Sequence, residues 1–176
     1  MRLAPPTKAK SVRTEQIILF RAGGQLFAIS SASVQEVRSV DSFAGSATEI
    51  STPGLRKVRH FVLRNNETLY VVNGAVHFGL PATPAALVFI LRKTRTVLLI
   101  DGIEKMSTMT HLQALPQAFC HEERHWYRGL TALDQSVVPV VKPEGFLTEF
   151  EIADLDAAVL ASAAAVADNA TTGAQP

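Results

Sequence analysis

The sequence lacks the features on which several classes of protein depend. Cys120 is its only cysteine, so no disulfide can form within the chain, as expected in a reducing compartment. No apolar run approaches the roughly 20 residues that a membrane-spanning helix needs, and the N-terminus lacks the apolar stretch of a signal peptide. We therefore expect a cytoplasmic protein without direct membrane insertion.

The common catalytic signatures are also missing. The chain has no glycine-rich loop between a strand and a helix that would cradle a phosphate, and no Gly-x-Ser-x-Gly elbow of the hydrolases. The formal net charge is only +1, and the nearly balanced charge of residues 14–142 is not the footprint of a nucleic-acid-binding protein. We expect a binding module that has no catalytic residues and no cofactor.

One string resembles a catalytic motif and supports an alternative. His121, Glu122 and His125 match the His-Glu-x-x-His pattern, in which two histidines one helical turn apart bind zinc. Glu144 or Glu149 is a candidate third ligand in this reading. The motif needs a helix with a packed face, but a proline shortly upstream and a strand soon after leave little room for one. We expect no bound metal, and a zinc metallohydrolase stays as the alternative hypothesis.

Short apolar segments joined by turn residues recur along the chain and predict β-hairpins. Gly23-Gly24 and Asn65-Asn66 suit the positive φ angles of tight hairpin turns. Many short strands with regular turns predict a mainly all-β sandwich or barrel. Pro139 cannot donate to a ladder, which places its strand at an edge or a bulge. The expected hairpins pair residues 17–21 with 25–29, 60–64 with 68–72, 87–91 with 96–101, and 129–133 with 137–141.

Charge and composition change at both ends of the chain. Residues 1–13 contain bases but no acid and predict a flexible basic arm. Thr148 and Glu151 fit a capping box at the start of a helix over 148–162, and residues 163–176 are expected to be a disordered tail. Residues 31–37 predict a short helix or turn. The hairpins between the ends fall in two halves, 14–80 and 85–147, which suits two small β-barrels that share a core.

The order of several short motifs resembles the CheW-like family of chemotaxis coupling proteins. Residues 24–29 read Gly-Gln-Leu-Phe-Ala-Ile and residues 34–38 read Val-Gln-Glu-Val-Arg, like the strand and the val-x-glu-val segment that open that domain. Residues 62–65, 69–73 and 78–80 stand where the family has its leu-arg-gly turn, its pro-val-val-asp strand and its leu-gly segment. Residues 97–103 and 127–130 resemble its later strands, so the resemblance covers residues 14–147.

The resemblance implies a double β-barrel of two small five-stranded SH3-like or OB-like barrels, with short helices and a C-terminal helix. It implies an adaptor that binds the cytoplasmic tip of a chemoreceptor and the regulatory domain of a histidine kinase. A CheW-like regulator of a kinase outside chemotaxis is a further alternative. The resemblance places the partner-binding residues at Val34, Glu36, Val37, Arg38 and Arg64.

Four positions depart from the family pattern. Asn65 replaces the turn glycine, Asn73 the aspartate and Tyr70 the proline, and Arg59 stands where a glycine usually precedes the strand. An asparagine at position 65 is still expected to form the tight turn. These changes concentrate in the first half, which in the family helps to form partner surfaces.

Overall fold

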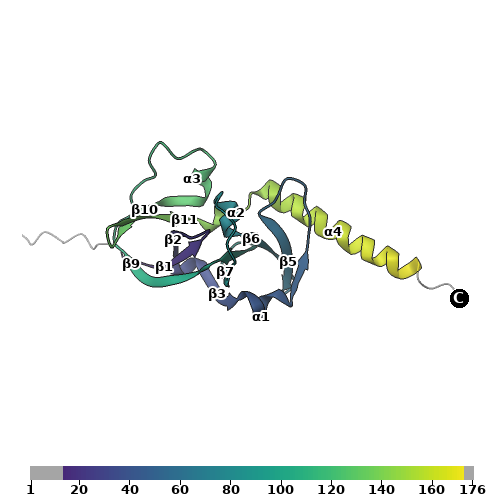
Figure 1. Cartoon of the computed structure of the whole chain (residues 1–176). Helices are drawn as coiled ribbons and strands as arrows, with labels where there is room; N and C mark the ends of the chain where they lie inside the picture. Colours follow the sequence, from purple (N-terminus) through teal and green to yellow (C-terminus); the bar gives the residue numbers. More distant parts are fainter. Residues whose placement is uncertain (1–13, 173–176) are drawn as a thin grey trace, which may run out of the picture.

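The computed structural model describes residues 14–172 and consists mainly of β-strands (Figure 1). The expected basic arm, residues 1–13, lies outside the described residues, as do residues 173–176. The strands form a five-stranded and a six-stranded sheet. The mainly all-β prediction is therefore confirmed, with one strand more than expected in the second sheet.

The five-stranded sheet has the order β10-β11-β2-β1-β9. Its parallel contact, Val140 opposite Ala28, joins β11 to β2. The sheet is built from β1 (Glu15–Ala22), β2 (Gln25–Ser30), β9 (Gly102–Met109), β10 (Tyr127–Leu133) and β11 (Ser136–Val141).

The six-stranded sheet has the order β3-β7-β8-β6-β5-β4. A parallel pairing of β6 with β8 holds its middle together. The strands are β3 (Val34–Ser39), β4 (Ala47–Glu49), β5 (Val58–Arg64), β6 (Glu67–Asn73), β7 (Leu87–Leu91) and β8 (Thr96–Ile100).

All four expected hairpins form. Their turns use the left-handed region of the backbone, with φ of 57° and 77° at Gly23 and Gly24 and 51° and 62° at Asn65 and Asn66. The division into sequence halves, however, is wrong as a description of the sheets. Each sheet takes strands from both halves, because β9 to β11 return to β1 and β2 while β7 and β8 join β3 to β6.

Both sheets curl strongly. Arg64 of β5 reaches Glu36 of the opposite edge strand β3, and Lys105 of β9 pairs with Asp134 in the turn after β10. The interiors are small apolar cores, one around Val62, Val88 and Val97 and another around Ile17, Leu19 and Val140. A larger shared core, with Phe20, Tyr70, Phe89 and Phe146 fully buried, lies between the sheets. No backbone pairing joins β3 to β4 in the described chain, so these are curled sheets rather than barrels closed by a continuous ladder.

The prediction that Pro139 lies on an edge or at a bulge is wrong. Its strand β11 lies between β10 and β2, and Pro139 stands opposite Leu130. The Leu130 amide and carbonyl bond Gln113 instead, at 2.9 Å and 2.7 Å. The ladder therefore needs no amide from Pro139 at this point, so the proline is tolerated inside the sheet.

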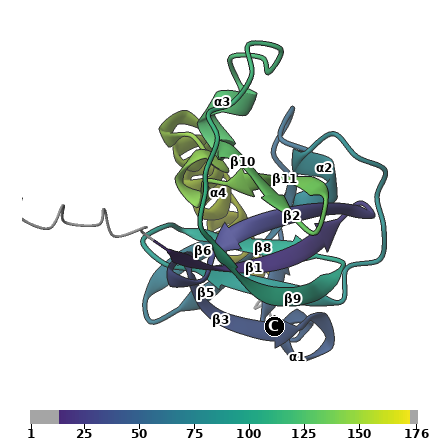
Figure 2. The same ribbon diagram turned by 90° about the vertical axis from the view of Figure 1, so that its left-hand side faces the viewer.

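The remaining elements are short, except at the C-terminus. They are η1 (Ser31–Ser33), α1 (Val40–Ala44), α2 (Gly74–His77), α3 (Glu123–Trp126), η2 (Pro143–Gly145) and α4 (Glu149–Thr172). Seen from the side, α4 lies behind the strands, and the segment that carries α3 extends away from the sheets (Figure 2). In the part of the chain that the structure describes, no helix is both long and apolar enough to cross a membrane.

Helix α4 begins as predicted but does not end as predicted. The Thr148 hydroxyl accepts the Glu151 amide at 3.1 Å, and the Glu151 carboxylate accepts the Thr148 amide at 2.8 Å. The helix continues to Thr172 instead of ending near residue 162, so the expected disordered tail is helical over 163–172. Alanine has the highest helix propensity, so this alanine-rich segment can stay helical without packing on the domain.

Candidate functional site

Glu36 joins two arginines at the edge of the six-stranded sheet. Its Oε2 accepts a hydrogen bond from Arg64 Nη2 at 2.6 Å, and its Oε1 accepts one from Arg38 Nε at 2.5 Å. The hydrogen bond from Arg64, followed by that from Arg38, holds the pKa of Glu36 below its usual value. Three of the five predicted binding residues thus form one charged cluster, and all three keep exposed side-chain surface.

The other two predicted residues differ in their exposure. Val37 is exposed over 41% of its surface, so it is available to a partner. Val34 is exposed over only 8% and belongs to the shared core. A buried side chain cannot touch a partner without moving, so Val34 supports the position of β3 instead. Gln35, its neighbour on β3, is exposed.

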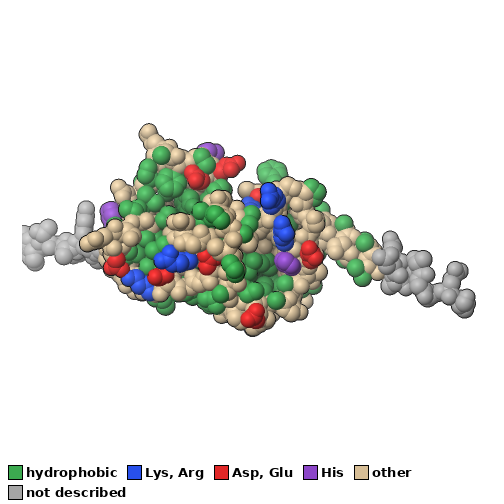
Figure 3. All heavy atoms as spheres, in the orientation of Figure 1, with side chains coloured by type: hydrophobic (Ala, Val, Ile, Leu, Met, Phe, Trp, Pro, Cys, Tyr) green, Lys and Arg blue, Asp and Glu red, His purple; other side chains and the backbone are tan. Residues whose placement is uncertain are grey.

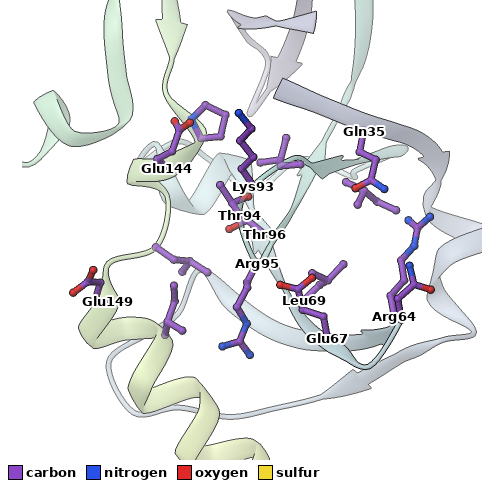
Figure 4. Close-up of a pocket in the computed structure, with 16 residues that line it drawn as sticks. Gln35, Arg64, Glu67, Leu69, Lys93, Thr94, Arg95, Thr96, Glu144 and Glu149 are labelled. Carbon is purple, nitrogen blue, oxygen red and sulfur yellow. The ribbon is translucent and has the colours of Figure 1, made fainter. Parts of the chain in front are cut away.

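A pocket of about 570 Å³ lies beside this charged cluster (Figure 4). Figure 4 shows Gln35 and Arg64 on one side, Glu144 and Glu149 on the other, and the β7–β8 turn with Lys93 and Thr94 between them. Both charge signs therefore line the pocket around the apolar side chains of Leu69, Ile90, Leu91, Leu147 and Ile152. Such a surface suits a polar protein segment that also carries apolar side chains.

Two polar atoms of the pocket lining have no hydrogen-bond partner among the described residues. They are Nη1 of Arg64 and Oγ1 of Thr94, and both are buried. An unpaired buried donor costs free energy, so a polar group that reached them would be stabilised. Sequence reasoning missed Thr94 and Lys93, since a polar hairpin turn is ordinarily only solvated.

The start of α4 forms one wall of the pocket and is fixed by ion pairs. Arg95 donates to both carboxylate oxygens of Asp156, at 2.8 Å and 2.6 Å, and its guanidinium lies 5.1 Å from the centre of the Tyr70 ring. The Tyr70 hydroxyl also bonds Asp156. Lys57 pairs with Glu151 at 2.7 Å. These contacts position α4, so the wall of the pocket depends on them.

The histidine string does not form the helix that a zinc site of this pattern requires. Helix α3 begins only at Glu123, which leaves His121 and Glu122 in the preceding turn, with the His121 and His125 ring centres 5.3 Å apart. Among the described residues, no group of three or more histidine, cysteine, aspartate or glutamate side chains is placed to hold a metal ion. The geometry therefore gives the metallohydrolase alternative no support.

Comparison with known proteins shows the family. The model of the CheW-like domain matches residues 16–151, so the chain belongs to the CheW-like domain family. The chain is 27% identical over 144 residues to a protein of Rhizobium etli described as a probable chemotaxis protein CheW, covering 77% of this chain and 89% of that one. Its fold is also that of the scaffolding protein TtCheW from Thermoanaerobacter tengcongensis, with a TM-score of 0.63, 12% identity, and coverage of 79% of this chain and 96% of that one.

Three departures from the family pattern have local structural roles. Asn65 keeps the tight turn through its φ of 51°. The Asn73 side chain accepts the Val76 amide at 3.1 Å and so caps α2, as an aspartate also does. Tyr70 is buried in the shared core and bonds α4. Arg59 is exposed on β5, and nothing in the structure explains it.

Proposed function

We propose that this chain is a non-catalytic adaptor of chemotaxis-type signal transduction that couples chemoreceptors to a histidine kinase. The family match over residues 16–151 supports the general role. The printed descriptions of the two similar proteins, a probable chemotaxis protein and a scaffolding protein, agree with it.

The observation that carries the choice of surface is the ion pair between Glu36 and Arg64. These residues match the acid of the family's val-x-glu-val segment and the arginine of its leu-arg-gly turn, 28 positions apart in sequence but 2.6 Å apart in space. Arg64 lines the pocket of Figure 4, and the residues next to the pair in sequence, Val37 and Leu63, are exposed over 41% and 70% of their surfaces. Charged groups beside apolar surface supply orientation and contact area for a protein partner.

The proposed partners are the cytoplasmic tip of a receptor and the regulatory domain of a kinase. An adaptor needs separate surfaces for two partners. We assign Glu36, Val37, Arg38 and Arg64 to one of them and leave the remaining surface to the other. The interactions need no cofactor or bound metal.

Isothermal titration calorimetry of the purified chain with each of the two fragments, in separate experiments, tests this function. The proposal predicts that both fragments bind at saturating ratios near one to one. Kinase binding without receptor binding would favour the alternative of a kinase regulator outside chemotaxis. If neither fragment bound, the adaptor role would be wrong.

A further inference from the structure

Arg59 helps to line a second pocket, which shares no lining residue with the pocket of Figure 4. Strand β5 has a β-bulge here, because Val58 stands opposite Val72 of β6 while His60 stands opposite the adjacent residue, Val71. Arg59 is therefore the extra residue of the bulge. Consecutive side chains of a regular strand point to opposite faces, but Arg59 and His60 both line this pocket. The bulge thus turns two neighbouring side chains toward one site.

The rim of this second pocket is basic. Its members come from the start of β5 and the residues just before it, and are Arg56, Lys57, Arg59 and His60. No acid lines the pocket in the part of the chain that the structure describes. Figure 3 shows Lys or Arg side chains and a histidine gathered near β5, on the face turned to the viewer. Two acids lie outside the lining: Glu151 pairs with Lys57 at 2.7 Å, and Glu49 of β4 stands opposite His60.

The guanidinium groups of Arg56 and Arg59 are available to a ligand. Both residues are exposed, and neither forms an ion pair within residues 14–172. Guanidinium groups bind carboxylate and phosphate through paired N–H donors. Two arginines at one pocket without a carboxylate partner therefore favour an anionic ligand.

The floor of the pocket is apolar and belongs to the core of the six-stranded sheet. Val71 is exposed over only 5% of its surface and lies in that core, and Leu99 packs against it. Both residues line the pocket near the ends of the parallel strands β6 and β8, where Asn73 pairs with Leu99. The pocket therefore opens at one end of the curled sheet, and the mouths of β-barrels are common sites for small molecules.

We propose that this pocket binds a small organic anion that also has an apolar part. The carboxylate or phosphate group lies between Arg56 and Arg59, and the apolar part covers Val71 and Leu99. The volume of about 340 Å³ is at the lower end of the roughly 300–1,000 Å³ of small-molecule sites. A protein segment laid across the rim would leave this apolar floor uncovered. The proposal does not rest on the adaptor function, because it concerns a different pocket.

NMR titration of the isotope-labelled full chain with octanoate tests the proposal. The amide signals of pocket residues such as Asn73 and Leu99 should shift and saturate. Octyl phosphate has the same tail and should shift the same signals, and the tighter of the two ligands identifies the preferred anionic group. Octylammonium, in which the charge is reversed, should not bind. Inorganic phosphate, which has no tail, should bind at least about tenfold more weakly.

Variants then locate the ligand. Arg56→Gln/Arg59→Gln should weaken octanoate binding by about tenfold or more with little change in Tm, since both side chains are exposed. The matched control Arg92→Gln/Lys142→Gln removes the same charge from two other exposed positions and should bind octanoate like the wild type. Ala82→Trp fills the pocket but keeps its charges, because Ala82 lines it, and should abolish binding.

Three results would overturn the proposal. They are no binding of octanoate, equal binding of octanoate and octylammonium, and wild-type octanoate affinity in Arg56→Gln/Arg59→Gln. If that variant instead lost affinity only for a receptor or kinase fragment, the basic rim would contact an acidic protein surface. The small-molecule site would then be wrong, while the adaptor function would stand.

Discussion

Arg64 Nη2 donates to Glu36 Oε2 across 2.6 Å and so links β5 to the edge strand β3. The pair is partly exposed, with side-chain exposures of 34% and 30%, and exposed ion pairs contribute little to folding. Reversing either charge, as Glu36→Arg or Arg64→Glu, should therefore reduce partner affinity by about tenfold or more with little change in Tm. Calorimetric titration with the receptor and kinase fragments measures this effect.

Two comparisons make this test specific. The double swap Glu36→Arg/Arg64→Glu keeps an ion pair but exchanges the positions of its two charges. Partner affinity should therefore stay low if the partner contacts an acid at position 36 and a base at position 64. The ion pair between Arg21 and Glu104 lies on the other sheet and serves as a matched control. Its two side chains are 2.9 Å apart and are equally exposed. An equal loss of affinity after swapping Arg21 and Glu104 would show that the effect is general electrostatics.

Leu155 and Leu160 on α4 should respond differently to truncation. Leu155 is fully buried, whereas Leu160 is 71% exposed. Leu155→Ala should cost ~2–5 kcal/mol, which at roughly 2–4 °C per kcal/mol lowers Tm by about 4–20 °C. Leu160→Ala should leave Tm unchanged. Thermal melts by circular dichroism at low concentration measure both, and equal melting of the two variants would contradict a docked helix.

Both tyrosines of the chain should resist ionisation in the folded protein. Burial raises the pKa of Tyr127 to about 12, and burial together with the bond to Asp156 raises the pKa of Tyr70 above its usual range. An unfolded tyrosine titrates near pH 10. The contribution of the buried, neutral tyrosines to folding stability is therefore fully present below that pH and is lost as the pH rises toward 12. Tyrosinate absorbance should appear together with unfolding. Its appearance at about pH 10 in a folded sample would refute the burial of these rings.

Local features of the fold were predictable from the sequence. Gly23-Gly24 and Asn65-Asn66 determine their turns through backbone preferences that do not depend on the rest of the chain. The capping box at Thr148 is likewise local. In contrast, the parallel pairings of β6 with β8 and of β11 with β2 join distant segments, and no pattern within either segment specifies its partner.

The errors also have physical causes. Pro139 lies inside a sheet because Gln113, distant in sequence, takes the hydrogen bonds of Leu130. Helix α4 runs past residue 162 because alanine propensity sustains it without contacts to the domain. A segment without large apolar residues has little to pack against the domain, but it can still be helical rather than disordered.

The candidate site was only partly visible in the sequence. Glu36 and Arg64 were found through the resemblance, but their contact is a product of sheet curvature. The burial of Val34 follows from its place on the inner side of β3, which the motif alone did not specify. Lys93 and Thr94 gave no signal, because their role depends on the turn lying beside α4.

Bridging of two partners by one chain is the central claim, and size-exclusion chromatography with light scattering tests it most directly. The receptor fragment and the kinase regulatory domain are mixed with and without the chain. The account predicts a single three-component peak with the chain, none without it, and its loss with Glu36→Arg/Arg64→Glu. If the chain bound each fragment but never both together, it would be a competitor rather than an adaptor, and the account would be contradicted.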